Sequence, residues 1–409
     1  MSPQEYPEPI SVLFFPSDGI SSFSVGMKPH ACLLSLFAVL VFTGCQSPRL
    51  PAETARQNFY PIGIYCVDRT NDFASVQAAG FNVITGPATK EFLDDAQANG
   101  LKVLASPGTT AGPDFDPARA RSVINAVGGH PALWAWYLVD EPDLNLISPE
   151  QVRRTQRFVK SLCPTKPTAL VIYKGDNARD YANIADVTMV DRYPIPWLPL
   201  ASFGQHVEMT RLALPPEKPL VAVIQAFDWN TARAELPDEK NTTMRPPTYA
   251  ELRCMTYEAL ARGANGLFYF AFDTGAWKIR EQTETWNALQ RVVAEVNARL
   301  PLFRAEQLWW PKRQRFADPE QRFNAALQAS ITSCRLRVRN GNAFVPAGDY
   351  ILAVNNTERA QNWSFTLPPG ESVTAAVPVL DENRQLSAVE GWVSDDFKPY
   401  MAHVFGPLP

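Results

Sequence analysis

The sequence predicts a (β/α)8 TIM barrel followed by a C-terminal antiparallel β-sandwich. Residues 59–303 alternate short apolar runs, rich in Val, Ile and aromatic residues, with amphipathic segments of helical period. Eight such alternations over about 240 residues match a (β/α)8 barrel in number and length. Residues 309–409 instead hold alternating runs separated by Pro, Gly and Asn turns, which is typical of a β-sandwich of about 100 residues.

The eight predicted barrel strands are short and nearly continuous in apolar character, as expected of parallel strands buried on both faces. They span 59–67, 81–85, 101–107, 133–139, 168–173, 185–190, 219–227 and 266–272. Several of the helical segments between them begin with Asp, Ser or Pro-Thr and end with Gly, and a last helix is expected over 284–300. An open doubly wound sheet is the rival fold, but no glycine-rich phosphate loop follows the first strand.

The N-terminal region predicts a lipid-anchored protein of the bacterial cell envelope. Residues 1–26 precede Met27 and are interpreted as an over-extended start, and residues 27–44 form a signal peptide with a short apolar run. Phe42-Thr43-Gly44-Cys45 resembles a bacterial lipobox, so Cys45 is the expected lipidation site. Gln46 favours the outer membrane, and the polar residues 45–58 are expected to form a tether.

Charge and ligand content exclude several classes of function. The chain holds 38 Lys and Arg against 42 Asp and Glu, and it has no basic run, which argues against nucleic-acid binding. Four scattered histidines without a CxxC or HExxH motif argue against a metal site, and no cofactor is expected. Cys66 and Cys254 lie in apolar patterns that suit free buried thiols rather than disulfides.

The strongest chemical signal follows the fourth predicted strand. WAWYLV is followed at once by Asp140-Glu141-Pro142-Asp143, so three acids should lie at the end of the barrel where active sites form. Apolar walls there would raise the pKa of a carboxyl group, as a general acid working near neutral pH requires. Glu141 is the predicted general acid, whereas Asp143 also suits a cap for the next helix.

These residues give the chain a specific resemblance over about residues 59–300. HPALWAWYLVDEPD, DVTMVDRYP, KPLVAVIQAFDW and RPPTYAELRCMTYEALARGANGLFYF look like retaining glycoside hydrolases of the large (β/α)8 clan. The chain is especially similar to bacterial beta-galactosidase-like secreted lipoproteins. In that clan an Asn-Glu-Pro after strand four supplies the acid/base, which the resemblance assigns to Glu141. The resemblance implies a carbohydrate substrate.

Two positions depart from the clan's pattern. The Asn that contacts the sugar 2-hydroxyl is Asp140 here, and Gln225 stands where strand seven should end in the nucleophilic Glu. Three mechanisms therefore stay open. Asp191, Asp228 or Asp273 supplies the second carboxylate; Asp140 and Glu141 act as the adjacent pair of a substrate-assisted hexosaminidase; or the protein binds glycans without turnover.

Other residues at the strand ends are expected to contact the sugar. Tyr65 and Gln225 are candidate hydrogen-bonding partners, and Asp273 is a further candidate contact. Aromatic faces suited to stacking on pyranose rings are expected at Tyr193, Trp197, Trp229 and Trp277. Arg192 and Arg245 could hold a carboxylate or simply pair with neighbouring acids. The long aperiodic loop 229–246 could close over the substrate and carry the missing carboxylate.

Overall fold

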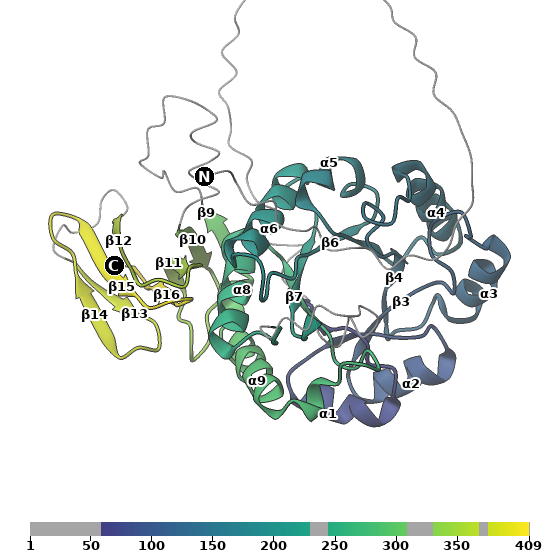
Figure 1. Ribbon diagram of the computed structural model, residues 1–409, viewed down its shortest axis with the longest axis horizontal. Helices are drawn as coiled ribbons and strands as arrows, with labels where there is room; N and C mark the ends of the chain where they lie inside the picture. Colours follow the sequence, from purple (N-terminus) through teal and green to yellow (C-terminus); the bar gives the residue numbers. More distant parts are fainter. Residues whose placement is uncertain (1–58, 230–243, 309–329, 368–374, 409) are drawn as a thin grey trace, which may run out of the picture. The chain divides into compact units, whose positions relative to one another are not determined.

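The barrel strands form a closed parallel ring. A computed structural model of the chain describes residues 59–229, 244–308, 330–367 and 375–408. Its strands pair in the order β1-β2-β3-β4-β5-β6-β7-β8 and close on β1 (Figure 1). They span Ile62–Ile64, Val83–Thr85, Lys102–Ala105, Leu133–Val139, Thr168–Ile172, Val187–Asp191, Leu220–Gln225 and Gly266–Phe270. Each lies inside its predicted run, except that β6 extends one residue further, to Asp191. The predicted barrel is confirmed.

Helices surround the ring on its outside, as Figure 1 shows. They are α1 Phe73–Ala78, α2 Lys90–Ala98, α3 Pro117–Val127, α4 Pro149–Leu162, α5 Ala178–Tyr181, α6 Ala201–Ala213, α8 Tyr249–Ala261, α9 Thr283–Ala298 and α10 Leu300–Phe303. Single 3-10 turns occur at η1 Thr70–Asp72, η2 Gly175–Asn177 and η3 Ile279–Glu281.

Local capping explains where the main helices begin. Asp116 accepts the amides of the first turn of α3, which starts at a proline. Ser148 with Gln151 and Thr248 with Glu251 form capping boxes at the starts of α4 and α8. Because these signals are local, they are visible in the sequence.

The barrel is filled by its own side chains. Val83, Ala169, Val171 and Val223 lie in the interior cluster, and Trp134 stacks on Phe268 with ring centroids 5.8 Å apart. The tight packing explains Gly63 on β1: a Cβ there would lie 2.4 Å from the Phe268 ring. A second cluster fills the space between strands and helices. The barrel is therefore a packed core whose open end carries the polar residues.

The C-terminal region forms two antiparallel layers. A six-stranded sheet runs β14-β13-β16-β11-β10-β9, and β12 pairs with β15. The strands are β9 Glu306–Leu308, β10 Ile331–Val338, β11 Gly348–Asn355, β12 Gln361–Thr366, β13 Ala376–Val379, β14 Arg384–Ser387, β15 Trp392–Phe397 and β16 Ala402–Phe405. Buried side chains of both layers, including Ile351, Phe365, Phe397 and Phe405, form one core. The predicted antiparallel domain is confirmed.

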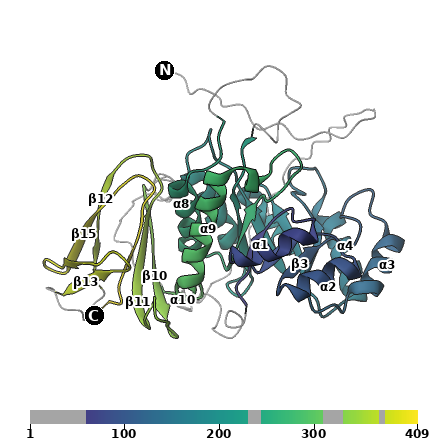
Figure 2. The ribbon, with the colours of Figure 1, turned by 90° about the horizontal axis from the view of Figure 1, so that it is seen from below.

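The six-stranded sheet packs on α8, and Figures 1 and 2 both show β10 and β11 beside this helix. Arg253 of α8 donates to the carbonyl oxygen of Ala402 at 3.1 Å, and the Cys254 thiol lies 3.5 Å from the carbonyl oxygen of Asn355. The described cysteines Cys66, Cys163, Cys254 and Cys334 are free. Both expected thiols are free; Cys254 is buried as expected, whereas Cys66 is only half-buried.

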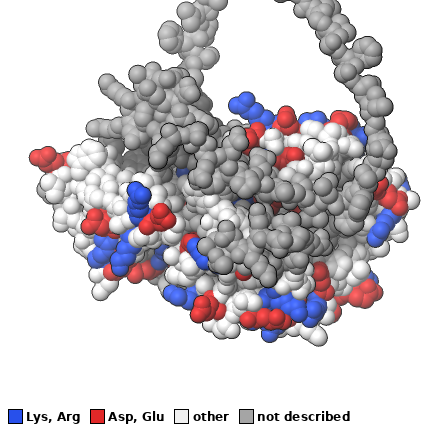
Figure 3. Space-filling view, in the orientation of Figure 1, with Lys and Arg blue, Asp and Glu red and all other residues white. Residues whose placement is uncertain are grey.

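Acidic and basic side chains are interspersed over the described surface in Figure 3. Within the described ranges, no helix combines the length and the apolar character that crossing a bilayer requires. The expected signal peptide, lipidated Cys45 and tether lie outside the described residues, as does most of the loop 229–246.

Candidate active site

An irregularity near the end of β4 changes which way the side chains of the following acids, Asp140 and Glu141, point at the barrel mouth. The pairing of β4 with β5 shifts register between Tyr137 and Val139. Tyr137 packs against the barrel interior, whereas Leu138 and Val139 both join the cluster beneath the helices. Leu138 is the extra residue of this bulge, and it changes the direction of the chain at the strand end. As a result, the Asp140 carboxylate accepts a hydrogen bond from the Tyr137 hydroxyl.

The backbone of Glu141 is held in an unusual conformation. Its φ angle is +40°, in the left-handed region that non-glycine residues rarely adopt. The Glu141 carbonyl oxygen accepts hydrogen bonds from the backbone amides of Leu144 (3.1 Å) and Asn145 (2.9 Å) and from the Asn145 side chain (3.1 Å). Strain of this kind persists where the surroundings hold it in place, and it is concentrated at functional sites.

The central feature of the mouth is a hydrogen-bonded pair of carboxyl groups, Glu141 after β4 and Asp191 at the end of β6. Burial raises the pKa of Glu141 to about 7, and the bond from Asp191 opposes part of that rise. Burial, then the nearby charge of Glu141 and the bond donated to it, raise the pKa of Asp191. Because both pKa values are raised, the pair keeps its protons closer to neutral pH than two ordinary carboxyl groups would.

Asp140 and Tyr65 complete this cluster. Burial raises the pKa of Asp140, while the bond from Tyr137 counteracts the rise. Tyr65, directly after β1, packs edge-on to Tyr137 with ring centroids 6.3 Å apart, and its buried phenol has a raised pKa. Both tyrosines thus stay protonated: the Tyr137 hydroxyl donates to Asp140, and the Tyr65 hydroxyl donates to the Met189 sulfur at 3.9 Å.

An aromatic wall borders the carboxyl pair on the side of β6 to β8. Tyr193 hydrogen-bonds Asp191, and its ring lies 5.6 Å from Phe270 and 5.2 Å from Phe227. Trp229 packs on Tyr193 and lies 5.4 Å from Trp197, whose side chain is exposed. The predicted residues Tyr193, Trp197 and Trp229 therefore form one surface leading away from the pair.

Two neighbouring strand ends add Tyr173 and Arg192. Tyr173 is the first residue after β5, and the charges of Glu141 and Asp191 both raise its pKa, after burial. Arg192, the first residue after β6, donates to the Tyr173 hydroxyl at 2.9 Å. Sequence reasoning did not select Tyr137 or Tyr173, although the position of Tyr173 directly after a strand was a usable signal.

Gln225 does not lie where a substrate contact would need it. The residue is fully buried, and its side-chain amide bonds the backbone of Ile195 on both sides (2.9 and 2.8 Å) and the carbonyl oxygen of Phe227 (3.2 Å). The side chain joins the end of β7 to the loop after β6. The predicted role of Gln225 in substrate binding is therefore wrong, because its polar atoms are used by the backbone.

Trp277 was also expected to contact the sugar, and the structure contradicts this. The side chain is 3% exposed, and its indole nitrogen donates to the carbonyl oxygen of Ala271 at 3.1 Å. The ring is part of the hydrophobic core rather than a stacking surface.

Asp273 lies on the opposite side of the mouth. One carboxylate oxygen accepts the Gly275 amide at 2.8 Å, and the other lies 3.5 Å from Arg69. Burial, followed by the charges of Asp68, Asp140 and Asp273, raises the pKa of the Cys66 thiol to about 12, so this sulfur is no nucleophile at neutral pH. A substrate contact by Asp273 stays a prediction.

Asp143 and Arg245 have structural partners. Asp143 accepts the backbone amides of Tyr173 (3.0 Å) and Lys174 (2.9 Å), so it holds the loop after β5 rather than capping α4, as its position had suggested. Arg245 pairs in bidentate fashion with Glu251, both contacts being 2.7 Å.

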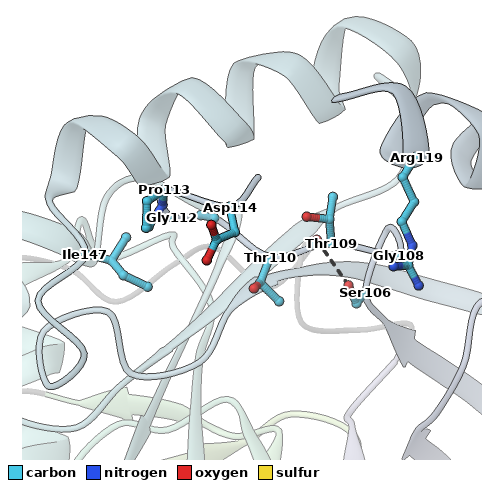
Figure 4. Close-up of a pocket in the computed structure, with 10 residues that line it drawn as sticks. Ser106, Gly108, Thr109, Thr110, Gly112, Pro113, Asp114, Arg119 and Ile147 are labelled. Atoms are coloured by element: carbon cyan, nitrogen blue, oxygen red, sulfur yellow. Dashed lines mark hydrogen bonds between the residues drawn. The ribbon is translucent and has the colours of Figure 1, made fainter. Parts of the chain in front are cut away.

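A separate hollow of about 460 Å³ lies beside the mouth, on the loop after β3 (Figure 4). Ser106, Thr109, Thr110, Asp114 and Arg119 line it, and the Ser106 hydroxyl donates to the Thr109 carbonyl oxygen at 3.2 Å. This hollow is open to solvent, and Asp140, Glu141 and Asp191 are not among the residues that line it. We therefore place the candidate site at the carboxyl pair, where the titratable groups converge.

Among residues in the described part of the chain, no group of three or more His, Cys, Asp or Glu side chains is arranged to hold a metal ion. Asp140, Glu141 and Asp191 instead bind one another or tyrosine hydroxyls.

Comparison with known proteins shows the fold. No protein-family model matches the sequence, and no curated protein matches it. Among solved structures, one described as a glycoside hydrolase is similar with a TM-score of 0.52 and 13% identity, covering 85% of this chain and 92% of that one. A variant of AmyP in complex with maltotriose is similar with a TM-score of 0.51 and 9% identity, covering 88% and 99%. The architecture is thus that of a (β/α)8 barrel with a C-terminal β domain, as found in glycoside hydrolases.

Proposed function

We propose that the protein hydrolyses glycosidic bonds and that Glu141 is its general acid. The observation that carries the proposal is the buried, hydrogen-bonded pair of Glu141 and Asp191 at the C-terminal end of the barrel. With a pKa of about 7, Glu141 keeps a proton in mildly acidic and neutral solution and can deliver it to the glycosidic oxygen as the bond breaks.

The contact between the carboxyl groups favours a positioning role for Asp191. Retaining hydrolases separate their two carboxyl groups by about 5–5.5 Å and inverting ones by about 6.5–9.5 Å, because the sugar or a water lies between them. A direct hydrogen bond is shorter than either separation. Asp191 then orients the Glu141 carboxyl rather than attacking the sugar.

Asp140 is the remaining carboxyl group beside Glu141. The bond from Tyr137 fixes its orientation, which suits it to hold a water or an acetamido group of the substrate for attack on the anomeric carbon. The aromatic surface of Tyr193, Trp229 and Trp197 supplies flat faces for neighbouring sugar rings. The similar fold of a maltotriose-bound protein supports a carbohydrate substrate.

Glycan binding without turnover is the second candidate function. It is favoured by Gln225, because strand β7 ends in a neutral side chain whose polar atoms are bound to backbone. The sequence-based expectation of a lipid anchor at Cys45 and an outer-membrane location is compatible with either function.

A substrate panel with matched variants tests the proposal. The purified protein, Glu141→Gln and Glu150→Gln are assayed against aryl glycosides and polysaccharides, and folding is followed by circular dichroism. Glu150 is an exposed residue of α4 that pairs with Arg157, so its variant controls for loss of one carboxylate. Turnover by the wild type and Glu150→Gln, lost in folded Glu141→Gln, supports hydrolysis. Turnover that survives in Glu141→Gln refutes the assigned acid, whereas binding without wild-type turnover supports the second candidate.

A further inference from the structure

Arg192 follows Asp191 directly and is a cation with no carboxylate partner among the described residues. Its guanidinium makes one hydrogen bond, to the Tyr173 hydroxyl at 2.9 Å, and lies 5.4 Å from the centre of the same ring. In the part of the chain that the structure describes, it forms no ion pair, although Asp191 is its neighbour in sequence. Its Nε atom is shielded from solvent and has no hydrogen-bond partner among the described residues.

This arrangement is unfavourable in the free protein. A partly desolvated guanidinium is normally paired with an anion, because its donors otherwise lose hydration without compensation. The neighbouring His206 adds no second positive charge, because burial and the Arg192 charge lower its pKa to about 4 and its ring is neutral at neutral pH. His206 also accepts the Gly175 amide at 2.8 Å, which fixes its position.

Tyr173 connects Arg192 with the part of the site where the substrate is expected to bind. The charge of Arg192 lowers the pKa of Tyr173, and the charges of Glu141 and Asp191 raise it, so the Tyr173 side chain lies near all three groups. Arg192 and Asp191 are also successive residues at the end of β6. A sugar whose glycosidic oxygen meets Glu141 would therefore have other ring substituents within reach of the guanidinium.

We propose that the site accepts glycans that contain uronic acid residues, with the sugar carboxylate bound by Arg192. This inference rests on the proposed glycosidase site and specifies its substrate class. The planar guanidinium matches the two oxygens of a carboxylate, and such charge-assisted bonds are the stronger ones in proteins. Because the raised pKa values favour protonated forms of Glu141 and Asp191, the pair repels an anionic sugar less than two ionised carboxylates would.

Binding and turnover are measured separately, so that the two proposals can fail independently. Binding of uronic acid oligosaccharides and of their neutral galacto and gluco counterparts to Glu141→Gln is measured by calorimetry. Turnover of aryl glycoside pairs that differ only at C6, carboxylate against hydroxymethyl, is measured with the wild type. Arg192→Gln is compared with Arg179→Gln, which removes an exposed arginine of α5.

We expect the wild type to prefer the uronide by at least tenfold in kcat/KM. Arg192→Gln should lose at least tenfold more kcat/KM on the uronide than on the neutral substrate and so remove that preference, and Arg179→Gln should keep it. Equal use of both members of each pair, or an equal loss on both in Arg192→Gln, overturns the assignment and reduces Arg192 to a support for Tyr173. Preference for O-sulfated over carboxylated sugars also overturns it. Uronide binding without any turnover preserves this inference and refutes hydrolysis.

Discussion

Replacing Glu141 by glutamine should stabilise the folded protein at alkaline pH. In the unfolded chain the Glu141 carboxyl has an ordinary pKa of 4.5, whereas burial raises its pKa to about 7 in the folded state. The folded protein therefore retains a proton that the unfolded chain releases between these values. Stability from this group is greatest below pH 4.5, falls as the pH rises toward 7, and stays low above pH 7.

The size of the effect follows from the same values. At about 1.4 kcal/mol for each pH unit between 4.5 and 7, an ionised Glu141 costs the folded state about 3 kcal/mol at pH 8. Glutamine has nearly the same shape and no charge, and its amide oxygen can accept the bond that Asp191 donates. At ~2 °C per kcal/mol for a domain of this size, Tm should rise by about 6 °C at pH 8 and little at pH 4.

Thermal and urea unfolding of the wild type, Glu141→Gln and Glu150→Gln at pH 4 and pH 8 measure this difference. Glu150 lies 2.8 Å from Arg157 on the surface of α4, so its loss should cost about 0–1 kcal/mol and stabilise at neither pH. A Glu141→Gln variant no more stable than the wild type at pH 8, or equally stabilised at both pH values, would refute the buried, proton-sharing pair.

Three further predictions concern neighbouring residues. Asp140→Asn should shift the alkaline fall of kcat/KM to lower pH, because the Asp140 charge helps to raise the pKa of Glu141; an unshifted pH profile contradicts this. Gln225→Leu should cost about 1–3 kcal/mol in urea unfolding, since the buried backbone groups of Ile195 lose their partners, and a change in KM without loss of stability would restore the predicted substrate contact. Trp277→Ala should cost about 3–5 kcal/mol in the same assay, and stability within 1 kcal/mol of the wild type would contradict a core position.

The fold was predictable because its signals are repeated and local. Buried parallel strands read as short apolar runs, and residues such as Asp116, Ser148 and Thr248 mark helix starts by capping. The number of predicted strand–helix units then indicates a barrel, because eight such units close into a ring. Glu141 was identifiable for a related reason, because it directly follows a strand whose end must reach the barrel mouth.

The details of the site depend on contacts between distant strands, which the sequence does not display. Asp191 was one of three candidate partners for Glu141, and only the barrel geometry brings the ends of β4 and β6 into contact. Gln225 ends strand β7 and Trp277 lies in the loop after β8, as functional residues do, yet their polar atoms bond to the backbone. Position after a strand indicates access to the mouth, but it does not indicate which way a side chain turns.

The most direct test of Glu141 as the general acid compares two substrates whose leaving groups differ in how much they need protonation. Turnover of a glycoside with a poor leaving group and of its dinitrophenyl counterpart is measured for the wild type and Glu141→Gln. If Glu141 is the general acid, the variant should lose about 10²- to 10⁴-fold on the poor leaving group and far less on the activated one. Equal losses on both substrates, or none, would contradict the account.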